Sequence, residues 1–152
     1  MYELKREQTV VCPLDQVFAF FERPENLVEI TPSAMRFEIL TPLPIRMMSG
    51  AVIDYTVKVF GIRTRWTTLI TDYDPPHRFS DVQLRGPYHL WHHSHRFESI
   101  NGGTRLIDNV RYILPFGLLG RLAHWLLVRH QLDTIFDYRH GIIEQRFGRT
   151  GE

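Results

Sequence analysis

The dipeptide Asn101-Gly102 is the feature of this sequence that most restricts its fold. It separates two stretches of alternating apolar and polar residues, 89–100 and 103–114, and Asn-Gly is the preferred pair for a two-residue type I′ turn. The two stretches are therefore expected to form a hairpin in which Ile100 faces Gly103. This one pairing fixes every other pairing between the two strands.

The predicted hairpin passes an independent test of its register. Trp91 and Phe97 mark the odd-numbered residues of the first strand as its buried face, because side chains alternate along a strand. The cross-strand pairs are then Trp91–Tyr112, His93–Val110, His95–Asp108 and Phe97–Leu106. The second strand consequently directs its apolar side chains inward and its charged Arg105 and Arg111 outward, as a half-buried strand requires.

The rest of the chain gives more strands and two short helices. Leu14, Val17, Phe18 and Phe21 have helical spacing after Pro13, and a second short helical segment is expected from Glu25 to Ile30. Alternating stretches with short turns between them indicate an antiparallel meander of about seven strands. The expected strands are residues 2–11, 37–40, 51–60, 62–73, 78–84, 89–100 and 103–114.

The last element is expected to be a helix of about thirty residues, from Phe116 to Phe147. Its apolar stripe is predicted to lie on the sheet, which has to curl around it, so the fold class is α+β. The stripe consists of Leu118, Leu122, Trp125, Leu132, Ile135, Phe136, Ile142 and Ile143. Residues 1–148 are expected to form one domain and residues 149–152 a frayed tail.

Composition excludes several classes of protein. Cys12 is the single cysteine, which rules out an internal disulfide and any paired-cysteine metal site, and the charged N-terminal residues do not resemble a secretion signal. We therefore expect a cytoplasmic protein. With 18 basic and 17 acidic side chains and no basic run, nucleic acid is not an expected partner. The region 118–128 is too short and too polar to span a membrane.

His93 and His95 face inward, and Asp108 is the acid predicted to meet them. Directly opposed side chains have Cβ atoms about 4.5 to 5.5 Å apart, so His95 and Asp108 are within hydrogen-bonding reach. Three interpretations remain open. A metal site needs a third ligand, for which Asp108 is the only candidate seen. The other two are a satisfied polar pair in an apolar core, and the polar end of a ligand pocket.

Aromatic residues favour the pocket. A turn at Phe60-Gly61 places Tyr55 opposite Trp66, which extends a lining predicted to include Trp91, Phe97 and Tyr112. The inward face of strand 78–84 is ambiguous, because Phe79, Asp81 and Gln83 compete with Val82 and Leu84. We accordingly predict a ligand-binding set and no metal. The set is Tyr55, Trp66, Trp91, His93, His95, Phe97, Asp108 and Tyr112.

Three stretches resemble the START/Bet v 1-like superfamily, also called SRPBCC: CPLDQVFAFFERPENLVEITP, GPYHLWHHSHRFESINGGTRLIDNVRYILPFGLLG and VRHQLDTIFDYRHGIIEQRF. They are similar to its bacterial polyketide cyclase/dehydrase-like or cell-division-inhibitor-like group, with a more distant likeness to coenzyme Q-binding START proteins. The resemblance implies a helix-grip fold whose cavity, between sheet and long helix, holds a hydrophobic molecule such as a lipid, quinone or polyketide.

Two further functional hypotheses stay open. The first is a cyclase or dehydratase without a cofactor, with His95 as general base, Asp108 as its orienting carboxylate and a raised His95 pKa. The second is contact with a membrane surface or a protein partner through Leu118, Leu119, Trp125 and Leu126, which lie near Arg121, Arg129 and His130. The oligomeric state and the identity of the ligand do not follow from the sequence.

Overall fold

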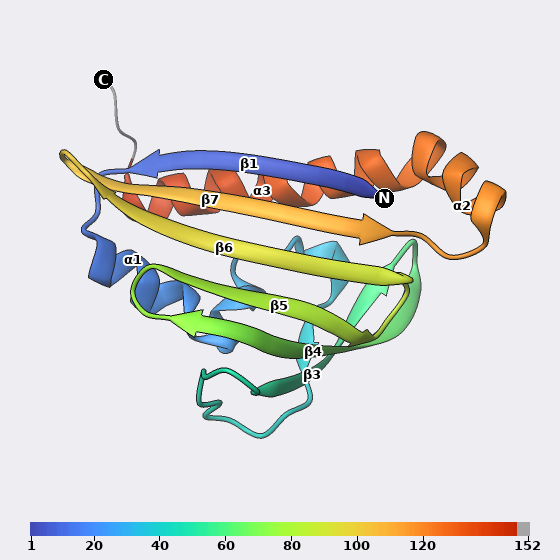
Figure 1. Cartoon of the computed structure of the whole chain (residues 1–152), viewed down its shortest axis with the longest axis horizontal. Helices are drawn as coiled ribbons and strands as arrows, with labels where there is room; N and C mark the ends of the chain where they lie inside the picture. Colours follow the sequence, from blue (N-terminus) through green and yellow to red (C-terminus); the bar gives the residue numbers. More distant parts are fainter. Residues whose placement is uncertain (149–152) are drawn as a thin grey trace.

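A seven-stranded antiparallel sheet and a long C-terminal helical segment make up most of the computed structural model, which describes residues 1–148 (Figure 1). The predicted frayed tail, 149–152, lies outside the described residues. The elements are β1 (Tyr2–Val10), α1 (Leu14–Phe21), η1 (Pro24–Val28), η2 (Ser33–Met35), β2 (Glu38–Ile39), β3 (Val52–Val59), β4 (Ile62–Asp74), β5 (Arg78–Arg85), β6 (Leu90–Ile100), β7 (Gly103–Ile113), α2 (Gly117–Ala123), η3 (His124–Val128) and α3 (Arg129–Phe147).

The sheet is a meander from β2 to β7, and β1 is added beside β7. Its order is β1-β7-β6-β5-β4-β3-β2, so consecutive strands from β2 to β7 are neighbours and β1 pairs with β7 at one edge. Two register shifts in β4, near Thr67 and Ile70, interrupt its pairing with β5. Such irregularities bend a strand and increase its twist. The predicted α+β helix-grip fold, with two short helices after the first strand, is confirmed.

The register of the β6–β7 hairpin is as predicted, but its turn is of another type. Ile100 pairs with Gly103, His95 with Asp108 and Trp91 with Tyr112. Gly102 has a φ of 87°, whereas Asn101 is not among the described residues with positive φ. This pattern fits a type II turn, so the prediction of a type I′ turn was wrong. The two types share the two-residue length, and length alone fixed the register.

Two groups of buried side chains hold the helices on the sheet. One group joins α1 to the C-terminal half of α3 through Phe18, Phe21 and Ile143. The other joins β1 and β7 to the N-terminal half of α3 through Leu132 and Phe136. Figure 1 shows α3 running along one face of the sheet beside β1 and β7. This half of the predicted apolar stripe is buried against the sheet as expected.

The other half of the stripe is not buried, which corrects the prediction. The helical segment is continuous from Gly117 to Phe147, but it includes a π-helical stretch, His124–Val128, and α2 extends past the end of β7 (Figure 1). Leu118 is 78% exposed and Trp125 80% exposed, because none of the described strands covers them. Within residues 1–148, no helix has the length and apolar character that crossing a membrane requires.

Candidate functional site

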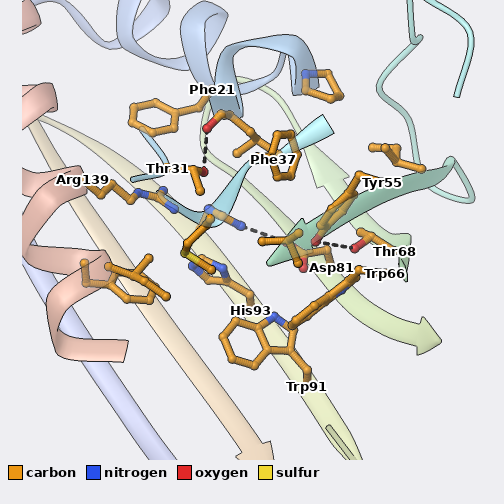
Figure 2. Close-up of a pocket in the computed structure, with 18 of the residues that line it drawn as sticks. Phe21, Thr31, Phe37, Tyr55, Trp66, Thr68, Asp81, Trp91, His93 and Arg139 are labelled. Atoms are coloured by element: carbon orange, nitrogen blue, oxygen red, sulfur yellow. Dashed lines mark hydrogen bonds and ion pairs between the residues drawn. The ribbon is translucent and has the colours of Figure 1, made fainter. Parts of the chain in front are cut away.

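A cavity of about 200 Å³ lies between α3, the inner face of the sheet and the η1–η2 region. It is larger than an engineered apolar cavity of about 150 Å³ that binds benzene. Most of its wall is apolar, and Figure 2 shows Arg139 reaching in from α3 toward the space that Tyr55, Trp66 and Trp91 border from the strands. The charged and imidazole side chains in the wall, Asp81, His93, His95 and Arg139, gather in one place, and Thr31, Thr68 and Gln131 are further polar residues of the wall.

Part of the predicted ligand-binding set lines this cavity. Tyr55, Trp66, Trp91, His93 and His95 are in its wall. Three others lie outside the wall. Asp108 sits behind the histidines, Phe97 packs against α1, and Tyr112 is fully buried with its hydroxyl 2.7 Å from His124 Nε2. Their role in binding a ligand stays a prediction, whereas the wall residues are in place to touch one.

The two inward histidines have different carboxylate partners. The His93 Nε2–H donates to Asp108 Oδ1 over 2.8 Å, and His95 Nε2 is bonded to Asp81 Oδ2 over 2.9 Å. His95 Nδ1 is 3.4 Å from Asp108 Oδ1, an ion-pair distance without hydrogen-bond alignment. His95 and Asp108 are therefore opposed and in contact as predicted, but the hydrogen bond expected between them is not formed. The idea that Asp108 is the one acid on this face is wrong, because Asp81 shares it.

Strand geometry explains the exchange of partners. Asp81 is directly opposite His93 on β5, while Asp108 is directly opposite His95 on β7. Each imidazole turns away from the acid directly opposite it and bonds the acid diagonally placed on the other neighbouring strand, His93 toward β7 and His95 toward β5. The two rings stack with centroids 3.7 Å apart. Diagonal neighbours in a sheet are within reach of long side chains. The result is a compact, buried group of two acids and two imidazoles.

Arg139 completes this group from the helix. Its Nη2 is 3.3 Å from Asp108 Oδ1, and the guanidinium lies 5.3 Å from the centre of the Phe21 ring. The Arg139 side chain is 10% exposed, so its charge is largely removed from water. A buried cation of this kind requires an anionic partner, which Asp108 supplies.

The pKa values in the group separate the two histidines. Burial and the nearby charge of His95 lower the pKa of His93 to about 4 despite its bond to Asp108. Burial also acts to lower the pKa of His95, but Asp108 and Asp81 outweigh it, so the pKa of His95 is raised as predicted. Burial works against ionised Asp108, yet the Arg139 charge and the His93 bond hold its pKa well below the ordinary value.

Three nitrogens in or beside the cavity wall are buried without a hydrogen-bond partner among residues 1–148: Trp66 Nε1, His95 Nδ1 and Arg139 Nε. The indole and the guanidinium nitrogen are donors only. A buried donor without an acceptor costs about 1–3 kcal/mol, so an acceptor oxygen that reaches the indole or the guanidinium nitrogen would stabilise the site.

Sequence reasoning missed Asp81 and Arg139, although a signal existed for each. Phe79 and Asp81 have the same parity on β5, and buried Phe79 stacks on His95 at 4.1 Å, which fixes the inward face. Arg139 falls between Phe136 and Ile143 at helical spacing, on the buried stripe of α3. A charged residue in that position indicates a buried anion nearby.

A family model described as "Polyketide cyclase / dehydrase and lipid transport" matches residues 10–135. The chain belongs to this family. The matched residues include Asp81, His93, His95 and Asp108, whereas Arg139 lies beyond them. No curated protein matches the sequence in a direct comparison.

Solved structures resemble the whole chain at low sequence identity. TTHA0849 from Thermus thermophilus has a TM-score of 0.73 and 15% identity, covering 95% of this chain and 99% of that one. CV1439 from Chromobacterium violaceum has a TM-score of 0.75 and 10% identity, covering 97% and 99%. Ms6760 from Mycobacterium smegmatis has a TM-score of 0.67 and 14% identity, covering 95% and 92%. At such identities these similarities establish the fold alone.

Proposed function

We propose that residues 1–148 form one domain that binds and carries a hydrophobic small molecule with an oxygen-bearing head group. The observation that carries the proposal is the cavity itself, a mostly apolar space whose charged and imidazole groups, Asp81, His93, His95 and Arg139, gather at one place. Ligand sites are commonly apolar with a few polar groups that orient the ligand. The family description, with its polyketide and lipid ligands, fits this chemistry.

The head group is argued from the unpaired donors. Trp66 Nε1 and Arg139 Nε are buried and lack acceptors among the described residues, so a carbonyl, quinone or carboxylate oxygen would satisfy them. An all-hydrocarbon ligand would leave both donors unpaired. We therefore expect a short-chain quinone or a fatty acid to bind more tightly than an alkane of similar size.

Tryptophan fluorescence provides a direct test. Of the three tryptophans, Trp66 and Trp91 line the cavity and Trp125 is on η3. In a Trp125→Phe variant, titration with decylubiquinone should quench the two cavity tryptophans to saturation at one quinone per chain. Dodecane should not compete. Absence of saturable quenching by the quinone, together with no thermal shift by dodecanoate, would contradict the proposal.

We further propose that the carrier exchanges its ligand at a membrane surface through the helical patch, defined as Phe116, Leu118, Leu119, Leu122, Trp125 and Leu126. Each of these side chains is more than half exposed. Contiguous exposed apolar side chains of this extent mark an interaction surface. The patch is also near the cavity along the chain, since less than one and a half helical turns separate Leu126 from the cavity-lining Gln131.

Charge selects an anionic bilayer as the partner. Residues 109–132 contain no Asp or Glu but include Arg111, Arg121 and Arg129. Arg111 and Arg129 lie 3.7 and 3.6 Å from Glu3 and Asp133, in ion pairs whose side chains are all more than a third exposed. An apolar helix face flanked by cations is typical of helices that lie in the interface of a membrane with anionic lipids. A protein partner would need a matching acidic and apolar surface, and self-association is the competing outcome that the test includes.

The test uses vesicles and the third tryptophan. In a Trp66→Phe/Trp91→Phe variant, Trp125 emission should shift to the blue with phosphatidylcholine–phosphatidylglycerol vesicles and much less with phosphatidylcholine alone. Leu118→Glu/Leu122→Glu should lower the vesicle-bound fraction about tenfold or more. Ile62→Glu, at a 69% exposed site on β4, is the matched control and should bind normally. A dimer in light scattering that the Leu118→Glu/Leu122→Glu change dissolves would instead assign the patch to self-association.

An enzyme remains the second candidate, and one observation favours it. His95 and Asp81 both face the cavity and share a 2.9 Å bond, so they have the geometry of a general base with a carboxylate partner. A β-hydroxy aryl ketone is a suitable probe, because loss of water gives a conjugated enone with new ultraviolet absorbance. An enzyme would show turnover that Asp81→Asn reduces at least tenfold, whereas a carrier would return the probe unchanged.

A further inference from the structure

One ligand-capable atom from each of Asp81, His93 and His95 lies within 4.8 Å of the others. We infer that these three residues bind one divalent transition-metal ion, of the Zn²⁺, Co²⁺ or Fe²⁺ class, at the polar end of the cavity. The sequence argued against a metal because Asp108 was the only third ligand in view and no outer support for the ligands was apparent. The structure supplies a different third ligand and places Asp108 in the supporting position.

The three side chains converge from two adjacent strands. Asp81 of β5 is directly opposite His93 of β6, and His95 is the next inward residue on β6. All three line the cavity, and both histidines are 6% exposed. Ligands on paired strands are held by the backbone ladder, so little ordering remains to be done when the ion binds.

Asp108 holds the two imidazoles from behind. It accepts from His93 Nε2 at 2.8 Å and lies 3.4 Å from His95 Nδ1, and it is not in the cavity wall. These contacts leave His93 Nδ1 and His95 Nε2 as the nitrogens for coordination. Metal-binding histidines almost always have a carboxylate, carbonyl or water at the other ring nitrogen, which fixes the ring and raises its basicity. Arg139, 3.3 Å from Asp108, keeps that carboxylate ionised.

The ion would replace the proton shared by His95 Nε2 and Asp81 Oδ2, which are 2.9 Å apart. Binding therefore releases a proton and converts a hydrogen bond into two coordination bonds. Two imidazoles and one carboxylate suit zinc, cobalt and iron, whereas calcium and magnesium prefer oxygen ligands alone. Three protein ligands leave at least one position open toward the cavity, where a water or an oxygen of the ligand head group would bind.

The proposed metal site lies in the same cavity as the proposed ligand. Metal binding is tested without any organic ligand, so the metal proposal and the carrier proposal can fail independently. Protein treated with EDTA and desalted is titrated with Co²⁺. A visible d–d absorption band should saturate at one Co²⁺ per chain and disappear when Zn²⁺ is added. Zinc retained after desalting should be one per chain by elemental analysis.

Variants locate the ion. Asp81→Asn and His95→Gln should each weaken Zn²⁺ binding at least a hundredfold, and Asp108→Asn should weaken it about tenfold to a hundredfold while the stoichiometry stays at one. His89→Gln changes an exposed histidine next to β6 and is the matched control, with unchanged affinity expected. Undiminished binding in Asp81→Asn and His95→Gln, or less than one Co²⁺ per chain in the parent protein, would overturn the inference.

A measurement on the unmutated protein covers variants that fail to fold. Long-range ¹H–¹⁵N spectra of the histidine rings should show zinc-dependent shifts at His93 Nδ1 and His95 Nε2. The nitrogens of His89 should not move. Shifts confined to exposed histidines would place the ion on the surface and refute the buried site.

Discussion

His93 and His95 are the same residue type on the same face of β6, yet their surroundings give them opposite protonation behaviour. The pKa of His93 falls to about 4, because burial and the neighbouring cation both disfavour its charge. The pKa of His95 rises despite burial, because two carboxylates surround it. The cluster therefore favours the protonated form of His95 and the neutral form of His93, beside the charges of Arg139, Asp81 and Asp108.

This separation predicts the pH dependence of stability. Between pH 6.5 and about 4 the unfolded chain binds a proton at His93 that the folded chain does not, so stability falls as pH falls, by up to about 1.4 kcal/mol per pH unit. His95 acts in the opposite sense. Its raised pKa gives stability that is fully present below pH 6.5 and is lost as pH rises through the folded value.

Nuclear magnetic resonance titration of the histidine rings, assigned with His93→Gln and His95→Gln, measures both values directly. Urea unfolding across the same pH range should give maximal stability from this pair near neutral pH, with His93→Gln removing most of the loss on the acid side. Two rings that both titrate near their ordinary pKa of 6.5 would show that the cluster does not exist in solution.

Asp108 is expected to be the most costly single residue to neutralise. Asp108→Asn removes the charge beside Arg139, whose side chain is 10% exposed, and should lower the free energy of unfolding by about 3 kcal/mol or more. Asp72→Asn removes an ion pair of similar length, 2.8 Å to Arg78, but with side chains 45% and 55% exposed. That control should change stability by less than about 0.5 kcal/mol. Urea unfolding measures the free energy of unfolding of both variants. Equal losses of stability would contradict a buried Asp108–Arg139 ion pair.

At the scale of elements, the hairpins and the C-terminal helical segment follow different rules. Turn length and alternation determined the β3–β4 and β6–β7 registers, since a shift of one residue would turn every buried side chain outward. The helical segment has no comparable constraint. Its apolar stripe predicted burial over the whole length, but the sheet ends before α2 and leaves that part of the stripe uncovered.

Glycine-to-alanine substitutions should have opposite effects on stability in the β6–β7 turn and in α3. Gly102→Ala places a Cβ at a φ of 87° and should lower the free energy of unfolding by about 1 kcal/mol or more. Gly141 lies within α3, and an added Cβ there meets no atom of residues 1–148 within 4 Å, so Gly141→Ala should raise stability by about 0.5–1 kcal/mol. Thermal and urea unfolding measure both, and a gain from Gly102→Ala would refute the turn conformation described here.

At the scale of the whole molecule, the cavity lies between the sheet and α3, in the space that two separate buried cores leave between them. The core around α1 and the core around the N-terminal half of α3 are separate. The cavity wall has Tyr55, Trp66 and Trp91 from the strands and Ile135 and Phe136 from α3, and these side chains do not fill the space between them. The cavity is therefore a property of how the helix sits on the sheet. No single element contains it.

Filling the cavity should block the ligand without disturbing the fold. Ile135→Trp adds an indole to the wall on α3 and should weaken decylubiquinone binding at least tenfold, because the added volume occupies the ligand's space. Ile142→Trp is the matched control, an isoleucine of the same helix and similar partial burial that packs on the α1 core and is not in the wall. Equal affinities in the two variants, measured by isothermal titration calorimetry because the added tryptophans would contribute to fluorescence, would show that the quinone binds elsewhere.

The sequence by itself determined that β2 to β7 are consecutive neighbours, the β6–β7 register and the inward direction of His93 and His95, because alternation and turn length are local properties with long-range consequences. It did not determine that β1 pairs with β7. It also did not determine which acid each histidine meets. That choice depends on diagonal reach across three strands and on Arg139 arriving from α3, 31 residues after Asp108. Tertiary structure alone decided the Asp81–His95 pairing, the exposed helical patch and the cavity, since each depends on distances between elements that no local pattern specifies.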